Sequence, residues 1–184
     1  MWETRSIMQA AHAESESTVA TSSRRTARAL FVATAVVLYL VDLGTKSLVV
    51  EKLADRGRVD LVGDLLGFRL TRNPGAAFGT GTSYTVLLSC VALVAVGVVV
   101  WLSARVANRV WALALGLLLA GVLGNLTDRV FREPGPFEGH VVDFIQLPHW
   151  PIFNVADMCI NVAALLILVQ AFRGVRLNGT RDGK

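Results

Sequence analysis

The chain has 184 residues, of which 53% are hydrophobic and 17% charged, with a mean hydropathy of +0.53. A soluble domain usually carries about a quarter charged residues, so this composition excludes an ordinary soluble domain and indicates a membrane protein. The net charge of +4 does not indicate nucleic-acid binding, because Lys and Arg are spread along the chain rather than gathered in one block. The two cysteines, Cys90 and Cys159, lie in apolar runs, so neither a disulfide framework nor a metal-binding cysteine pair is expected.

Residues 1–28 are rich in Ser, Ala, Thr and Glu and end in Arg24, Arg25 and Arg28, which predicts a disordered N-terminal arm. These arginines and the apolar stretch over 29–41 also resemble a signal peptide. However, no small-residue cleavage site follows the stretch, and the apolar pattern resumes after DLGTK as SLVV. The segment is therefore interpreted as a membrane span.

Four segments have the roughly 20 mostly apolar residues that a spanning helix needs. They are residues 29–50, 83–103, 111–131 and 155–172. The predicted fold is an all-α membrane protein with four transmembrane helices. Its predicted organisation is a disordered arm over 1–28, a four-helix domain over 29–172 and a tail over 173–184.

The distribution of basic residues predicts the orientation of the chain in the membrane. Ten of the eighteen Lys and Arg residues lie in the arm, the 104–110 connection and the tail, whereas six lie in the other two loops. The positive-inside rule therefore places both termini in the cytoplasm and the loops 51–82 and 132–154 outside. Both outer loops mix apolar and β-branched residues with Gly and Pro, which predicts short strands and turns on the membrane surface. Within the first, Asn73-Pro74-Gly75 suits a tight turn.

In this topology the polar residues of the helices gather near the outer interface. Ionisable residues inside a membrane are costly, so they indicate a functional site by default. The residues concerned are Asp42, Lys46, Asn125, Asp128, Arg129, Asn154 and Asp157, with Asp143 just before the last helix.

Each of these residues also has a purely structural interpretation. Asp42 and Lys46 are four residues apart and can pair on one helix face, with Lys46 extending outward to the interface. Asn154 can cap the last helix, with Asp157 in its first turn, but this account leaves the nearby Asp143 unexplained.

Elimination narrows the chemistry. The sequence contains neither GxSxG nor HExxH, and the spacing of His140 and His149 does not favour a zinc site. No cofactor or metal is expected. Two aspartates that meet can hydrolyse a peptide bond, since one holds a proton and polarises the carbonyl while the other activates water. The spacing of Asp143 and Asp157 does not by itself show that they meet.

Five stretches, in order, resemble the lipoprotein signal peptidase (signal peptidase II) family of bacterial inner-membrane aspartic endopeptidases. They are DLGTK (42–46), RNPGAAFG (72–79), GNLTDR (124–129), VVDF (141–144) and FNVAD (153–157). Each is weak alone, whereas five in order on a four-helix chain of this length are specific. Two departures from the family pattern, Pro74 and Ala120-Gly121, leave the carboxylates untouched.

This resemblance implies a substrate, a catalytic pair and an inhibitor class. The substrate is a prolipoprotein whose cysteine bears diacylglycerol, and cleavage before that cysteine releases the signal peptide. Asp143 and Asp157 are implied as the catalytic pair, and loop 51–82 as a small β-platform on the membrane. Inhibition by the cyclic peptide globomycin is also implied. The residues implied to support substrate and dyad are Asn73, Asn125, Arg129 and Asn154.

Three alternatives remain at this stage. Asp128 is a third candidate for the dyad, although its neighbour Arg129 favours an ionised carboxylate, and both residues can instead simply mark the interface. A small proton-coupled transporter or channel subunit would use Asp42, Asp128 and Asp157 as a relay, but transporters more often show a repeat and polar residues near the midplane. A presenilin-type protease lacks support because its GxGD signature is absent.

Overall fold

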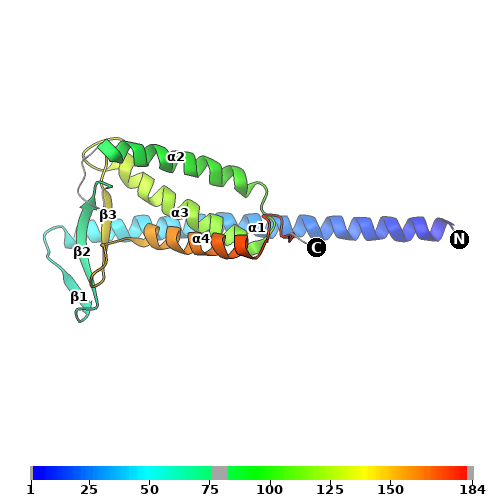
Figure 1. Ribbon diagram of the computed structural model, residues 1–184, viewed down its shortest axis with the longest axis horizontal. Coiled ribbons are helices and arrows are strands. Elements are labelled where there is room, and N and C mark those ends of the chain that lie inside the picture. The colour runs from blue at the N-terminus through cyan, green and yellow to red at the C-terminus, as the bar shows by residue number, and fades with distance from the viewer. Residues whose placement is uncertain (1, 76–82, 182–184) are drawn as a thin grey trace.

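The computed structural model describes residues 2–75 and 83–181, with side chains described from residue 22 onward. Its elements in chain order are α1 (Trp2–Leu53), β1 (Val59–Val62), β2 (Leu66–Asn73), α2 (Ser83–Ser103), α3 (Arg109–Phe131), β3 (Val141–Gln146) and α4 (Val155–Phe172). The helices form an elongated bundle, and a small sheet covers one of its ends (Figure 1).

Four helical segments are long and apolar enough to cross a membrane: Ser22–Leu53, Tyr84–Ser103, Arg109–Phe131 and Val155–Phe172. They confirm the four predicted spans, and the last three agree within about two residues at each end. Helix α3 is the centre of the bundle, because 56% of its apolar window is buried whereas the other three windows bury only 17–22%. The Leu and Val side chains exposed on the other three helices are available to face lipid, which solvates them as well as a protein core does.

Small residues let α3 approach its neighbours closely. A Cβ at Gly116 would lie 2.9 Å from the carbonyl oxygen of Phe31 on α1, and one at Gly121 would lie 2.7 Å from Cγ1 of Ile160 on α4. Both positions therefore exclude any side chain. This close packing holds α3 against α1 and α4, the two helices that carry Asp42 and Asp157 near the sheet.

The strands form one antiparallel sheet in the order β1-β2-β3. The first two strands come from the loop after α1, as expected, and the third comes from the loop before α4. In this register Thr71 lies opposite Asp143, and Asn73 lies opposite Val141. The sheet packs on the end of α1 through a cluster of Val49, Leu53, Val142 and Phe144. It thereby brings the two loops together and fixes Asp143 at the end of the bundle.

The structure corrects the expectation of a disordered arm over residues 1–28. Helix α1 already begins at Trp2 and projects past the other helices at the end opposite the sheet (Figure 1). The physical reason lies in the composition, because residues 1–43 contain neither Gly nor Pro and include many Ala, Glu and Arg residues. These are good helix formers, and no residue type interrupts the helix.

Candidate active site

Asp143 and Asp157 meet around one residue, Asn154, which is fully buried at the start of α4. The side-chain amide nitrogen of Asn154 donates to Oδ1 of Asp143 at 2.6 Å. Its side-chain oxygen accepts from the backbone nitrogen of Asp157 at 2.9 Å, and Oδ2 of Asp157 accepts from the backbone nitrogen of Asn154 at 3.2 Å. The expected N-cap is therefore confirmed as a full capping box. The same side chain also binds Asp143, which the cap alone would not require.

Asp143 lies on β3 and is 2% exposed. Besides Asn154, the side-chain amide of Asn73 donates to its Oδ2 at 2.9 Å. Burial raises the pKa of this carboxyl to about 6, and the charge of Asp157 adds to the effect, whereas the hydrogen bonds from Asn73 and Asn154 oppose it. The surroundings of Asp143 therefore favour its protonated form more than water does for a free aspartate.

Asp157 lies in a more polar and more open environment. Its Oδ1 accepts from the side-chain amide of Asn125 on α3 at 2.9 Å, and the residue is only half-buried. A carboxylate in the first turn of a helix is stabilised by the helix dipole. Two neighbouring carboxyl groups in unlike environments are the pattern by which proteins separate an acid from a base.

Asn73 reaches Asp143 from a turn at the end of β2. The backbone nitrogen of Gly75 donates to the side-chain oxygen of Asn73 at 2.8 Å, and Gly75 has a φ of +103°. Asn73 therefore closes a turn onto the backbone of Gly75, where the positive φ favours glycine. The fourth residue of the predicted tight turn lies outside the described residues. The remainder of the RNPGAAFG stretch, residues 76–79, lies outside the described residues.

Arg129 lies beside this turn. A Cβ at Gly75 would be 3.2 Å from Nη1 of Arg129. The guanidinium interacts electrostatically with Asp143, Asp128 and Asp157, and Nη1 has no hydrogen-bond partner among the described residues. The Nη1 group of Arg129 is therefore a buried hydrogen-bond donor to which the described residues offer no acceptor.

Lys46 is a buried hub behind the pair. Its Nζ lies 2.8 Å from Oδ2 of Asp42, 3.0 Å from Oδ2 of Asp128 and 3.0 Å from Oδ1 of Asn125. The expected Asp42–Lys46 pair is present, but the expectation that Lys46 extends outward is wrong, since the residue is 0% exposed. Two buried carboxylates and an amide oxygen attract its ammonium group more strongly than the interface does.

Asp42 and Asp128 are engaged in structural contacts. Oδ1 of Asp42 accepts from the backbone nitrogen of Ala156 at 2.8 Å and so caps α4 from the neighbouring helix α1. Asp128 accepts from the backbone nitrogen of Val142 at 3.1 Å and forms an ion pair with Arg132. Asp128 thus fixes the strand that carries Asp143 and is itself fully occupied.

Two further contacts were not predicted from the sequence. The hydroxyl of Thr85 donates to the carbonyl oxygen of Pro74, and that of Ser89 donates to the carbonyl oxygen of Phe137 at 2.8 Å. Both side chains are fully buried and fix the two loops of the site on α2. A hydroxyl in an apolar run is only a weak indication of a tertiary contact in the sequence. Ser and Thr side chains also donate to carbonyl oxygens of the preceding helical turn, as Ser89 does to Thr85.

A four-span membrane protein that holds a buried and a half-buried aspartate on one asparagine at one end has the architecture of a membrane aspartic hydrolase. The sequence model of the family described as signal peptidase (SPase) II matches residues 34–173. The chain therefore belongs to the signal peptidase II family and is a peptidase. Among residues 22–75 and 84–181, whose side chains the structure describes, no three His, Cys, Asp or Glu residues are grouped to hold a metal ion.

Individual relatives support this family membership. The chain is 49% identical to a lipoprotein signal peptidase of Streptomyces griseus over 79% of this chain and 74% of that protein. It is 46% identical to a lipoprotein signal peptidase of Streptomyces coelicolor, over 87% of this chain and 78% of that protein. A bacterial membrane enzyme solved by the in meso method at 2.3 Å resolution superposes with a TM-score of 0.68 and 26% identity, over 84% of this chain and 94% of that one. Nothing in these comparisons supports the transporter or channel alternative.

Proposed function

We propose that this peptidase removes the signal peptide from diacylglyceryl-modified bacterial prolipoproteins by cutting before the lipid-bearing cysteine. The observation that carries the proposal is the bridge through Asn154, which holds two carboxyl groups in unlike environments at one end of a membrane-spanning bundle. Family membership and the lipoprotein signal peptidases among the relatives supply the substrate class.

Asp143 is the acid and Asp157 the base of the proposed reaction. Protonated Asp143 donates a hydrogen bond to the scissile carbonyl, and ionised Asp157 takes a proton from the attacking water. The new C–O bond gives a tetrahedral intermediate. Transfer of the proton from Asp157 to the amide nitrogen lets the C–N bond break, and the two products are a carboxylic acid and the amine of the cysteine. Because the carboxyl groups interact, they titrate as a pair.

Four neighbours support the pair in this proposal. Asn73 and Asn154 orient Asp143. Asn125 and the backbone nitrogen of Asn154 each donate to one oxygen of Asp157, and each oxygen keeps a lone pair that can accept a proton from water. The unused Nη1 of Arg129 is placed to donate to a carbonyl oxygen of the substrate. A globomycin-type cyclic peptide would compete for the same donors, so we expect it to inhibit cleavage.

The proposed orientation has both termini in the cytoplasm and the pair near the outer leaflet of the bacterial inner membrane. Two observations support it. Lys and Arg are biased toward the arm, the 104–110 connection and the tail. The start of α1 and the end of α4 both lie opposite the sheet (Figure 1). Single cysteines at exposed Arg58 and Glu138, in a background without Cys90 and Cys159, should react with an impermeant reagent from outside. Reaction only after the cytoplasmic side is opened would reverse the orientation.

The test of the reaction is to incubate purified enzyme with a diacylglyceryl-modified prolipoprotein and to measure signal-peptide loss by mass spectrometry. Asp143→Asn and Asp157→Asn should each abolish cleavage while the protein stays folded in detergent. Asp55→Asn, which changes an exposed carboxylate outside the site, should leave cleavage unchanged. If either site variant keeps more than a few per cent of the activity, the assignment fails and Asp128 is the next candidate.

A further inference from the structure

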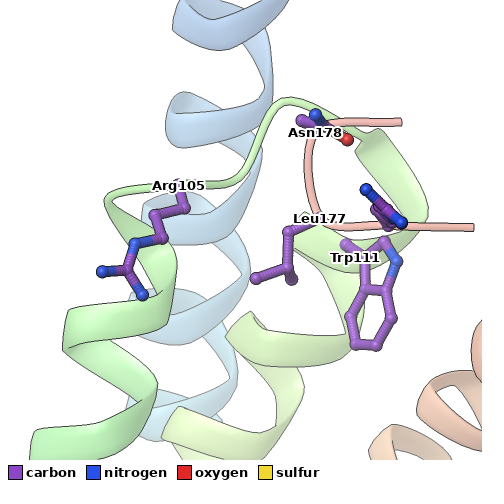
Figure 2. Close-up of a pocket in the computed structure, with 5 residues that line it drawn as sticks. Arg105, Trp111, Leu177 and Asn178 are labelled. Carbon is purple, nitrogen blue, oxygen red and sulfur yellow. The ribbon is translucent and has the colours of Figure 1, made fainter. Parts of the chain in front are cut away.

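The end of the bundle opposite the sheet contains a pocket of about 450 Å³ to which neither the fold nor the proposed reaction gives a role. It is lined by Arg105, Trp111, Arg176, Leu177 and Asn178 (Figure 2). Figure 2 shows Leu177 between Arg105 on one side and Trp111 on the other. The volume lies within the roughly 300–1,000 Å³ of sites that bind small molecules.

The pocket is built by the tail, which folds back on the connection between α2 and α3. The carbonyl oxygen of Leu177 accepts from the backbone nitrogens of Ala107 and Asn108 at 3.0 and 3.1 Å. The indole nitrogen of Trp111 donates to the carbonyl oxygen of Val175 at 2.8 Å. These hydrogen bonds join segments far apart in the sequence, so the pocket is a fixed feature of the fold.

The pocket lies at the depth where three spans end. Helix α2 ends at Ser103, α3 begins at Arg109 and α4 ends at Phe172. Trp101 and Phe172 are exposed at this level, and aromatic side chains mark the boundary between the hydrocarbon and water. A ligand here would meet the head-group region of the membrane rather than bulk water.

The segments that form and surround the pocket are strongly basic. Segments 104–110 and 173–181 together contain five arginines and no acidic residue, and the first acidic residue of the tail is Asp182. Arg28 of α1 adds a sixth charge, because its Nη2 donates to the carbonyl oxygen of Ala104 at 3.1 Å. The field at the pocket therefore favours an anion.

Arg105 is held in a geometry suited to an anion. Its guanidinium lies 3.6 Å from the ring centroid of Trp101. Such stacking uses the face of the guanidinium, whereas its five N–H donors lie in the plane and point outward. A planar fork of donors matches the oxygens of a phosphate.

We propose that this pocket binds an anionic phospholipid, with the charged head group facing the basic rim that Arg105 and Arg176 form and the apolar glycerol–acyl region against Leu177 and Trp111. Basic pockets beside the ends of membrane-spanning helices commonly take such head groups. The apolar floor and the interfacial depth favour a lipid over a soluble phosphate. The inference is independent of the proposed peptidase reaction.

The experiment uses the purified full-length protein in detergent. Phosphatidylglycerol, phosphatidylcholine and glycerol phosphate are added separately, and bound lipid is counted by native mass spectrometry. We expect phosphatidylglycerol to bind at least ~10-fold more tightly than phosphatidylcholine, and Arg105→Gln/Arg176→Gln to lose most of this preference. The control Arg56→Gln/Arg69→Gln removes the same charge from exposed positions at the sheet end and should keep it.

Three results would overturn the proposal. Equal binding of phosphatidylglycerol and phosphatidylcholine would show that the pocket does not select an anion. An unchanged preference in the double variant would show that the anion binds elsewhere on the protein. Displacement of phosphatidylglycerol by glycerol phosphate at similar concentration would make the ligand a soluble phosphate. If the double variant does not fold, Arg105→Gln and Arg176→Gln are measured singly. Each should weaken the binding of phosphatidylglycerol and leave the binding of phosphatidylcholine unchanged.

Discussion

Replacement of Lys46 by Met tests whether the buried hub holds the site together. Met keeps an unbranched chain but removes the ammonium group, which leaves Asp42 and Asp128, each 1% exposed, without their shared partner. Removing one member of a buried ion pair typically costs about 3–5 kcal/mol, because a charge stays buried without compensation. For a protein of this size, 1 kcal/mol corresponds to roughly 2–4 °C, so Tm should fall by roughly 6–20 °C.

The assay is thermal unfolding in detergent, followed by tryptophan fluorescence. The matched control is Lys52→Met, because Lys52 is 64% exposed and its ion pair with Glu51 lies at the surface. Its Tm should stay close to that of the wild type. A Tm of Lys46→Met within 2–3 °C of the wild type, allowing about 1 kcal/mol, would refute the role of the ion-pair cluster.

A second variant separates unpaired charge from lost packing. Asp42→Asn/Lys46→Met/Asp128→Asn contains no buried charge at the hub, so it should recover a substantial part of the lost Tm. If the triple variant is as unstable as Lys46→Met, the damage comes from packing instead. Activity should stay low in both variants, since Lys46 fixes the oxygen of the Asn125 amide and thereby directs the nitrogen of that amide toward Asp157.

Three further outcomes are expected. Because the pKa of Asp143 is raised to about 6 from 3.8, the folded state binds this proton more tightly than the unfolded chain. The stability that it contributes is therefore present below pH 3.8 and lost as the pH rises through about 6. kcat/KM should fall through the same range, and a stability profile of Asp143→Asn that matches the wild type would contradict the shift. Asn154→Ser keeps a capping oxygen but loses the amide donor to Asp143, so cleavage should drop by ~10-fold or more, by analogy with losses around metal ligands. Its Tm should change little, and equal activity would reduce Asn154 to a cap. Gly124→Ala places a Cβ against the carboxylate of Asp42 and should lower the free energy of unfolding by about 1–3 kcal/mol. At Gly97 on α2 the added Cβ meets no atom within 4 Å, so Gly97→Ala should leave the stability unchanged or raise it. Equal Tm shifts in the two variants would contradict this packing.

The helices of this protein were predictable because membrane spans obey a one-dimensional rule. A run of about 20 apolar residues forms a helix wherever lipid surrounds it, since the backbone has no other hydrogen-bond partner there. The predicted spans 83–103 and 155–172 have the same bounds as the observed helices α2 and α4. The start of α1 was not predicted, because the polar composition of residues 1–28 indicated disorder whereas the absence of Gly and Pro allows a continuous helix.

The residues of the candidate site could be predicted from the sequence, but the contacts among them could not. The polar residues among apolar neighbours, and the five family stretches, marked Asp143, Asp157 and their asparagines in the sequence. The sequence could not predict that Lys46 turns inward, because the carboxylates that hold it come from α1 and α3. Nor could it predict that Asp42 caps α4, since the two partners lie 114 residues apart.

The sequence by itself therefore determined the membrane class, the four spans and the set of ionisable residues. The cost of placing a polar group in lipid is a property of the residue and its immediate neighbours. Only the tertiary structure decided which of the two carboxyl groups is the more deeply buried. That difference depends on how deeply β3 buries Asp143, how α4 exposes Asp157 and where the amide of Asn154 reaches between them. Burial and hydrogen bonding between separate segments exist only after α1, α3, α4 and the sheet have packed, so no local pattern contains them.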